Sequence, residues 1–238
     1  MKLSHKAAKA AVNLLFRILI RLEVNGKENL PSEGPLIVVA NHLHLIDPPL
    51  LIVSLPRWIS FMAKEELFRS WPYLPVMKWA QAFPAYRKGS IGDRAKALRQ
   101  AREMLEQGLL VGMFPEGMRS RGAQLLAGYA SPVIIASKSG CPLLPVAICG
   151  TEKLRGIGWM IRPKVTIDIG QPFMLPLTGE LNKSQIMSSG DFVMRHIACL
   201  LPQEYRGNYG AELNQFPLGK SEEYSGQKAV PIAPRPVE

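Results

Sequence analysis

The sequence predicts an α/β protein with a mostly parallel central sheet flanked by helices, and with an amphipathic helix at its N-terminus. Short apolar runs of strand length alternate with longer segments of helical periodicity between residues 36 and 201. Most of these runs are continuously apolar, which is typical of strands covered on both faces. Such alternation favours parallel strands joined by helices. The chain has 238 residues, of which 47% are hydrophobic, and this is enough for one large domain with its own core.

The first segment, residues 2–22, is expected to form the amphipathic helix. Polar and basic residues recur there every three or four positions and so share one face of a helix. They are Lys2, Lys6, Lys9, Asn13, Arg17 and Arg21. Residues 1–27 hold six lysines and arginines against one glutamate, which is half of the formal charge of +10. This placement favours docking on an anionic membrane surface over nucleic-acid binding, and the alternative is a helix packed on the domain.

The rest of the chain divides into a main domain over residues 28–207 and a tail over residues 208–238. Strands are expected at residues 36–40, 59–63, 82–87, 109–114, 142–148 and 165–170. Helices are expected at residues 49–55, 73–80, 91–107, 126–139 and 183–201. Beyond Asn208 the periodicity is lost and prolines accumulate, which predicts a flexible tail. No run of 18 apolar residues occurs, so no membrane-spanning segment is expected.

The chain has three cysteines, Cys141, Cys149 and Cys199, all in apolar surroundings. An odd number without Cys-x-x-Cys spacing predicts buried thiols in a reducing compartment, without disulfides or zinc ligation. His42, His44 and Asp47 resemble part of a metal site, but we expect none because other candidate ligands are sparse.

Two polar segments follow predicted strands, and we expect them to carry the chemistry. The first contains His42 and Asp47, just after residues 36–40. An imidazole can accept a proton near neutral pH, and a carboxylate on its second nitrogen would fix the tautomer and stabilise the imidazolium. Pro48 and Pro49 stiffen the turn that would bring the two together. The alternative is that Asp47 only caps the following helix.

The second segment contains Glu116, Gly117 and Arg119, just after residues 109–114. Glycine lets a ligand approach the backbone closely, and an arginine fork matches a phosphate group. Arg87 closes another predicted strand and would supply a second cation, since ligands bind beyond the carboxyl ends of such strands. We expect Glu116 to hold an arginine or to accept a hydrogen bond from a substrate hydroxyl. The alternative is a surface loop of salt bridges.

The segments offer a base but no protein nucleophile. There is no Gly-x-Ser-x-Gly sequence and no cysteine in a polar loop. We therefore expect the substrate's own hydroxyl to attack an acyl thioester, whose thiolate is a good leaving group. Walker A and Gly-x-Gly-x-x-Gly sequences are absent, so no nucleotide cofactor is expected.

At these residues the sequence resembles the glycerolipid acyltransferase family, best known from lysophosphatidic acid acyltransferases. His42 and Asp47 match its His-x4-Asp block, residues 83–87 its second block, residues 114–120 its third and residues 144–148 its fourth. The resemblance implies that family's α/β fold for residues 28–207 and a membrane-docking helix in residues 1–27. It assigns His42 and Asp47 to catalysis, and Arg87, Glu116, Gly117 and Arg119 to the acceptor.

The resemblance also implies the reaction and its partners. An acyl group passes from acyl-CoA or acyl-carrier protein to a lysophospholipid, with 1-acylglycerol-3-phosphate giving phosphatidic acid, on the cytoplasmic face of the plasma (inner) membrane. No metal, bound organic cofactor or nucleic acid is implied. Met118 stands where the family usually has threonine, and Gln81 where it has glycine. These departures keep two alternatives open, which are a different lysolipid or lipid alcohol as acceptor and a non-catalytic lipid-binding module.

Overall fold

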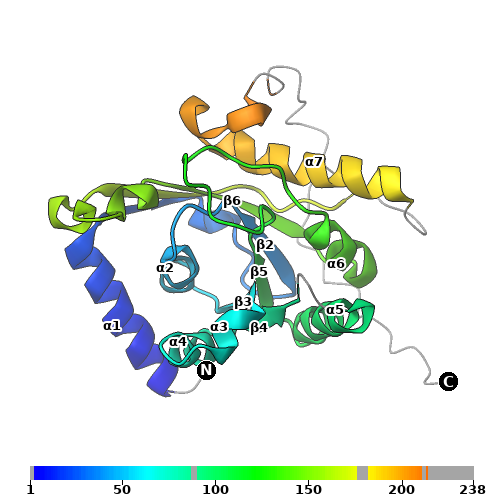
Figure 1. The fold of residues 1–238 in the computed structure, drawn as a ribbon, viewed down its shortest axis with the longest axis horizontal. Coiled ribbons are helices and arrows are strands. Elements are labelled where there is room, and N and C mark those ends of the chain that lie inside the picture. The colour runs from blue at the N-terminus through cyan, green and yellow to red at the C-terminus, as the bar shows by residue number, and fades with distance from the viewer. Residues whose placement is uncertain (1–2, 87–89, 176–181, 211–212, 214–238) are drawn as a thin grey trace.

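The structure, a computed structural model, describes residues 3–86, 90–175, 182–210 and 213. Its centre is a seven-stranded sheet with the order β1-β7-β6-β2-β5-β3-β4 (Figure 1). The strands are β1 (Arg21–Asn25), β2 (Leu36–Ala40), β3 (Ile59–Lys64), β4 (Phe83–Ala85), β5 (Leu110–Met113), β6 (Leu143–Cys149) and β7 (Lys164–Ile169). β6 and β7 pair antiparallel and every other neighbouring pair is parallel, which confirms the mostly parallel sheet.

Helices cover both faces of the sheet (Figure 1). They are α1 (Leu3–Leu19), α2 (Asp47–Ser54), α3 (Glu65–Arg69), α4 (Leu74–Trp79), α5 (Ile91–Glu106), α6 (Ser131–Ser139) and α7 (Lys183–Leu200). Five short 3-10 helices lie between or after them: η1 (Lys27–Asn29), η2 (Thr151–Leu154), η3 (Gly158–Ile161), η4 (Gln203–Tyr205) and η5 (Gly207–Tyr209). In the described residues no helix is both long and apolar enough to cross a bilayer.

The core has two halves, one on each face of the sheet. In β2, Ile37 and Val39 pack with α5, α6 and α7, whereas Leu36, Val38 and Ala40 pack with α1 and α2. Alternate residues of a strand point to opposite faces, so a strand that is apolar at every position serves both halves. This is why the continuous apolar runs predicted the central strands correctly.

The prediction of a helix over residues 2–22 was wrong at its end. α1 ends at Leu19, and Arg21–Asn25 form β1 at the edge of the sheet, paired parallel with β7. Arg21, Glu23 and Asn25 are exposed while Leu22 and Val24 are half-buried, which is the period of two of a strand with one covered face. Pairing with β7, about 140 residues further on, overrides the local helical pattern.

The predicted helix over residues 126–139 also begins later, since α6 starts at Ser131 with Pro132 in its first turn. Residues 126–130 form a loop instead, and two of their N–H groups bond to the segment after β5. Leu126 donates to Glu116 Oε2 at 2.9 Å, and Tyr129 donates to the Pro115 carbonyl at 2.8 Å. Instead of forming helical hydrogen bonds, these N–H groups thus donate to the polar segment after β5 and hold it in place.

The N-terminal boundaries of α5 and α7 follow from capping boxes at Ser90 with Asp93 and at Asn182 with Gln185. The predicted tail begins inside the fold, because η5 reaches Tyr209 and that side chain is buried. The tail beyond residue 213 lies outside the described residues. All three cysteines are free thiols, with Cys141 and Cys149 buried and Cys199 half-buried.

Candidate functional site

The two polar segments meet at the carboxyl ends of β2 and β5. These strands are parallel neighbours, so the segments that leave them emerge at the same edge of the sheet. The His42 N–H donates to Glu116 Oε1 at 2.7 Å, and the Ser120 N–H donates to the His42 carbonyl at 2.7 Å. The structure therefore brings His42, Asp47 and Glu116 together as one site.

His42 and Asp47 are in direct contact. His42 Nδ1 lies 2.8 Å from Asp47 Oδ2, and the imidazole is only 16% exposed while Asp47 is fully buried. With Nδ1 assigned as the donor, the unprotonated nitrogen is Nε2. The pair thus has the geometry of an oriented general base.

Asp47 has a second task, which is to shape the turn between β2 and α2. The same oxygen, Oδ2, also accepts the N–H groups of Leu43 and His44, at 2.7 Å each. Asp47 begins α2 and is followed by Pro48 and Pro49, so the carboxylate also stands in the first turn of a helix. The N-cap position is Ile46 and no side-chain hydrogen bond caps α2, so the interpretation of Asp47 as the cap of the following helix was wrong.

An aromatic stack holds the imidazole from one side. The His42 and Phe114 rings lie 4.1 Å apart at 20°, and Phe114 stacks on Phe61 at 5.2 Å and 11°. Gly112 lies opposite Phe61 in the β3–β5 pair, where a side chain would collide with the Phe61 ring. Because Gly112 has no side chain, the Phe61 ring fits against β5 and supports the aromatic stack that holds His42.

Within the described residues, the hydrogen-bond partners of Glu116 are backbone groups. Its carboxylate accepts the His42 N–H and the Leu126 N–H, so it ties the loop after β2 to the loop before α6. Burial raises the pKa of the Glu116 carboxyl to about 7, against the opposing effect of these two hydrogen bonds. In this structure Glu116 organises the backbone of the site.

Gly117 and Arg119 continue this segment at the surface. Gly117 has φ +65° in a turn closed by its N–H and the Phe114 carbonyl, a conformation that favours glycine. Arg119 and Met118 are exposed, and Arg119 has no hydrogen-bond or ion-pair partner within the described part of the chain. The guanidinium is thus available to an external anion. Arg87, the other predicted cation, lies outside the described residues.

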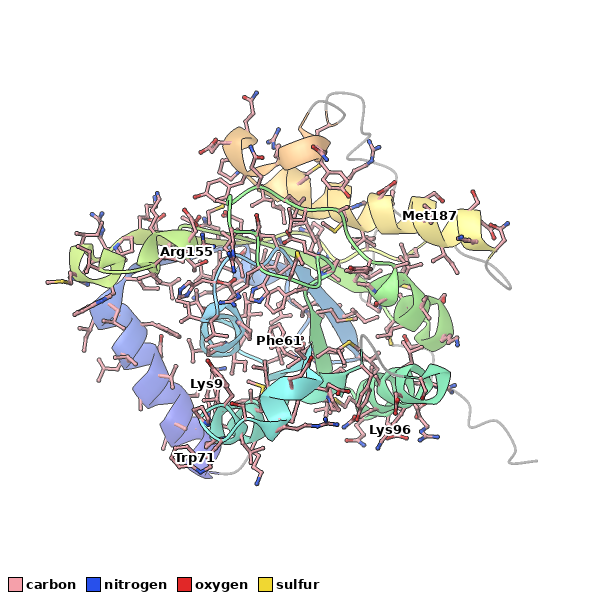
Figure 2. The ribbon with its side chains drawn as sticks, viewed as in Figure 1. Lys9, Phe61, Trp71, Lys96, Arg155 and Met187 are labelled. Carbon is pink, nitrogen blue, oxygen red and sulfur yellow. The ribbon has the colours of Figure 1, made fainter. Side chains whose placement is uncertain are left out.

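Two residues of the site were given no role in the sequence analysis. Asn41 joins β2 to β6, because its side chain donates to the Ile148 carbonyl and accepts the Ile148 N–H. Arg155, in the segment after β6, donates to the carbonyls of Leu43, Ser120 and Arg121 (Figure 2). The position of Asn41 directly before His42 is a sequence signal that could have found it, but nothing in the sequence near Arg155 indicates a role for that residue.

His44 lies close to Asp47 and His42. Its Nδ1 is buried without a hydrogen-bond partner in the described residues. Burial lowers the pKa of this imidazole, partly offset by Asp47 and reinforced by Arg155 and Arg119. In the described segments, no three His, Cys, Asp or Glu side chains are grouped so that they could hold a metal ion.

Comparison with known proteins adds a family to this geometry. A family model described as Acyltransferase matches residues 21–149. A chloroplastic 1-acyl-sn-glycerol-3-phosphate acyltransferase from Brassica napus is 29% identical over 161 residues, covering 66% of this chain and 45% of the relative. A 1-acyl-sn-glycerol-3-phosphate acyltransferase from Bacillus subtilis is 29% identical over 170 residues, covering 71% of this chain and 81% of the relative.

The chain spans about half the length of the curated relatives from Brassica napus, Arabidopsis thaliana and Borreliella burgdorferi. Among solved structures, the 1-acyl-sn-glycerophosphate (LPA) acyltransferase PlsC from Thermotoga maritima has 30% sequence identity and a TM-score of 0.61. That match covers 79% of this chain and 76% of the PlsC chain. Both the fold and the sequence around the site are thus shared with acyltransferases.

Proposed function

Because the chain belongs to the acyltransferase family that includes the lysophosphatidic acid acyltransferases, we propose that it acylates the free hydroxyl of a lysophospholipid. The proposed acceptor is 1-acylglycerol-3-phosphate and the product is phosphatidic acid. The observation that carries the proposal is the 2.8 Å contact between His42 Nδ1 and the buried Asp47 carboxylate. A protein that only binds lipid has no use for an oriented base, so this contact argues against the non-catalytic alternative.

His42 acts as the general base. Its Nε2 removes the proton from the acceptor hydroxyl as the hydroxyl oxygen attacks the thioester carbonyl. The C–S bond then breaks, the ester remains on the acceptor, and the departing thiolate takes the proton from His42. Asp47 stabilises the transient imidazolium, and the Phe114 ring keeps the imidazole in plane.

The acceptor's phosphate is proposed to bind at the turn after β5. Arg119 is exposed beside Gly117, which has no side chain to obstruct a ligand. Arg87 and Glu116 are the other residues proposed for the acceptor, with Glu116 acting through the loop it fastens. An exposed Met118 on the same turn offers no hydroxyl, and this favours testing lysolipids with other headgroups as the second candidate acceptors.

The proposed setting is a membrane surface. The helix α1 docks on the bilayer, the acyltransferase domain begins at β1, and the location is the cytoplasmic face of the plasma (inner) membrane. The acyl donor is acyl-CoA or acyl-carrier protein, with a metal and a bound organic cofactor unnecessary. The excess of cations in residues 1–27 supports the docking.

An acceptor screen tests the function. The protein is supplied with one long-chain acyl-CoA, or the same chain on carrier protein, and with a panel of lysophospholipids that differ only in headgroup. Lipid mass spectrometry then identifies the product. Phosphatidic acid as the dominant product supports the first candidate, and acylation of a different lysolipid supports the second. Thioester consumption by none of the acceptors would contradict both.

A further inference from the structure

The segment between β6 and β7 exposes an unusual set of large apolar side chains. Within five residues, Ile157, Trp159, Met160 and Ile161 are each between 51% and 77% exposed. They lie in and next to η3, a single short turn of helix that projects from the sheet (Figure 1). Exposed apolar clusters of this kind mark surfaces that another phase or molecule covers.

A second exposed apolar face lies on α1. Leu14, Leu15 and Ile18 are 51–62% exposed, whereas Phe16 is buried against the domain. Lys9, placed by the sequence on the outer polar stripe, instead points inward and donates to the Leu55 carbonyl at 2.6 Å. Burial accordingly lowers the pKa of Lys9. α1 therefore packs on the domain with one face and presents leucine and isoleucine to the outside.

These two apolar surfaces are held together. Arg162, which follows Ile161, donates from Nη2 to the Arg17 carbonyl in the last turns of α1 at 2.8 Å. Arg21 returns a bond from Nε to the Arg162 carbonyl at 3.2 Å. In Figure 2, Trp71 lies on the same side of the molecule as α1, and Met187 lies on the opposite side.

The residues next to these two apolar surfaces carry positive charge. A cavity of about 370 Å³ lies between α1, β1 and α2, apart from the residues around His42. It is lined by Arg17, Arg21, Lys27 and Arg162, and none of its described lining residues is acidic. Cations beside exposed leucine, isoleucine and tryptophan match the phosphate and acyl layers of a bilayer, where tryptophan prefers the boundary.

We propose that Ile157–Ile161 inserts into a phospholipid bilayer beside α1, so that the protein docks through two distant parts of the chain while Arg17, Arg21, Lys27 and Arg162 face the lipid phosphates. The inference rests on the proposed function, because docking on a bilayer would bring a lipid acceptor to His42. Arg155, two residues before Ile157, bonds to the carbonyls of Leu43 and Ser120. A residue two positions before the inserted segment is thus hydrogen-bonded to both loops of the site.

The test uses a triple variant, Ile157→Ser with Trp159→Ser and Ile161→Ser, in the full chain. The matched control is Met187→Ser, which removes an equally exposed apolar side chain (63%) from α7. Binding is measured by co-sedimentation with vesicles of phosphatidylglycerol and phosphatidylcholine. We expect the triple variant to bind at least about tenfold more weakly and the control to bind like the parent. Equal binding by the triple variant and the parent would overturn the proposal.

Two further measurements show whether weaker binding by the triple variant is caused by unfolding, and whether the variant affects docking or the acyl transfer itself. Thermal unfolding of the triple variant is expected to match the parent, because the replaced side chains face solvent. Activity towards a short-chain, water-soluble lysophosphatidate is expected to be unchanged, while activity towards acceptor in vesicles falls with binding. If the parent lacks activity towards every acceptor, the proposed function fails, yet vesicle binding still decides the docking.

The charge component has its own variant. Arg17→Gln keeps the carbonyl that Arg162 uses and removes one cation from the cavity. We expect weaker binding to phosphatidylglycerol vesicles, unchanged binding to pure phosphatidylcholine vesicles, and a smaller dependence on salt. An equal loss on both vesicles, or no loss on either, would contradict the assignment of Arg17 to the net negative charge of an anionic lipid surface.

Discussion

Replacing Asp47 by asparagine isolates the charge of the proposed dyad from its shape. Asp47 Oδ2 accepts three N–H groups, from the His42 ring and from the backbones of Leu43 and His44. The amide oxygen of asparagine can take the same place and keep all three bonds. The turn should therefore form, while the negative charge that stabilises an imidazolium is lost.

The magnitude follows from the geometry. Opposite charges about 4 Å apart attract by about 4 kcal/mol at an effective dielectric constant of about 20. Because about 1.4 kcal/mol corresponds to a tenfold change in rate, we expect kcat to fall by about three orders of magnitude. The new NH₂ group would occupy the place of Oδ1, which has no hydrogen-bond partner in the described residues. A buried unpaired donor costs about 1–3 kcal/mol of stability.

The assay is thiol release from acyl-CoA with the acceptor found in the lipid screen, together with thermal unfolding. The matched control is Asp168→Asn, which removes a carboxylate bonded to Asn25 at the far end of β7. We expect the control to keep its activity. Asp47→Asn with kcat within tenfold of the parent, in a folded protein, would refute the assignment of Asp47 as the group that stabilises the imidazolium.

Three further predictions concern the scaffold of the site. Glu116→Gln should change the pH dependence of the stability of the fold. A carboxyl whose pKa is raised from 4.5 to about 7 contributes stability that is complete below pH 4.5 and is lost as the pH rises through about 7. The parent should therefore lose stability relative to the variant between pH 5 and 8 in urea titrations, and parallel curves would contradict burial of a titrating Glu116. Gly112→Ala should destabilise the fold by about 1–3 kcal/mol and lower kcat, because the added methyl group would collide with the Phe61 ring that stacks on Phe114. An unchanged melting temperature and an unchanged kcat would show that the aromatic stack is dispensable. Arg155→Gln should lower kcat/KM by about tenfold through displacement of the two loops it joins, and full activity in steady-state kinetics would contradict that positioning role.

The sequence predicted those features that depend on local pattern. Continuous apolar runs marked β2, β5 and β6, and the predicted polar residues that meet in the site follow β2 and β5. The contact between His42 and Asp47 was expected because a stiff turn of fixed length separates them. Each of these depends on residues that are close in the chain or on the general geometry of parallel sheets.

The remainder depends on partners that are distant in sequence. Arg21–Asn25 continue a helical pattern and become a strand only because β7 offers an edge to pair with. Glu116 was expected to hold an arginine or to accept a hydrogen bond from a substrate hydroxyl. Its two backbone partners, the N–H groups of His42 and Leu126, cannot be foreseen from its own surroundings. Arg155 is another such case, because its role consists of three carbonyls on other loops.

The measurement that tests the central claim most directly is acyl transfer by His42→Ala. Alanine removes the imidazole but keeps the backbone N–H that Glu116 accepts, so the loop should stay in place. With acyl-CoA and the identified lysophospholipid, we expect turnover to fall by about 10²–10⁴ while the melting temperature changes little. Turnover equal to that of the parent would show that the acceptor hydroxyl is activated by some other group.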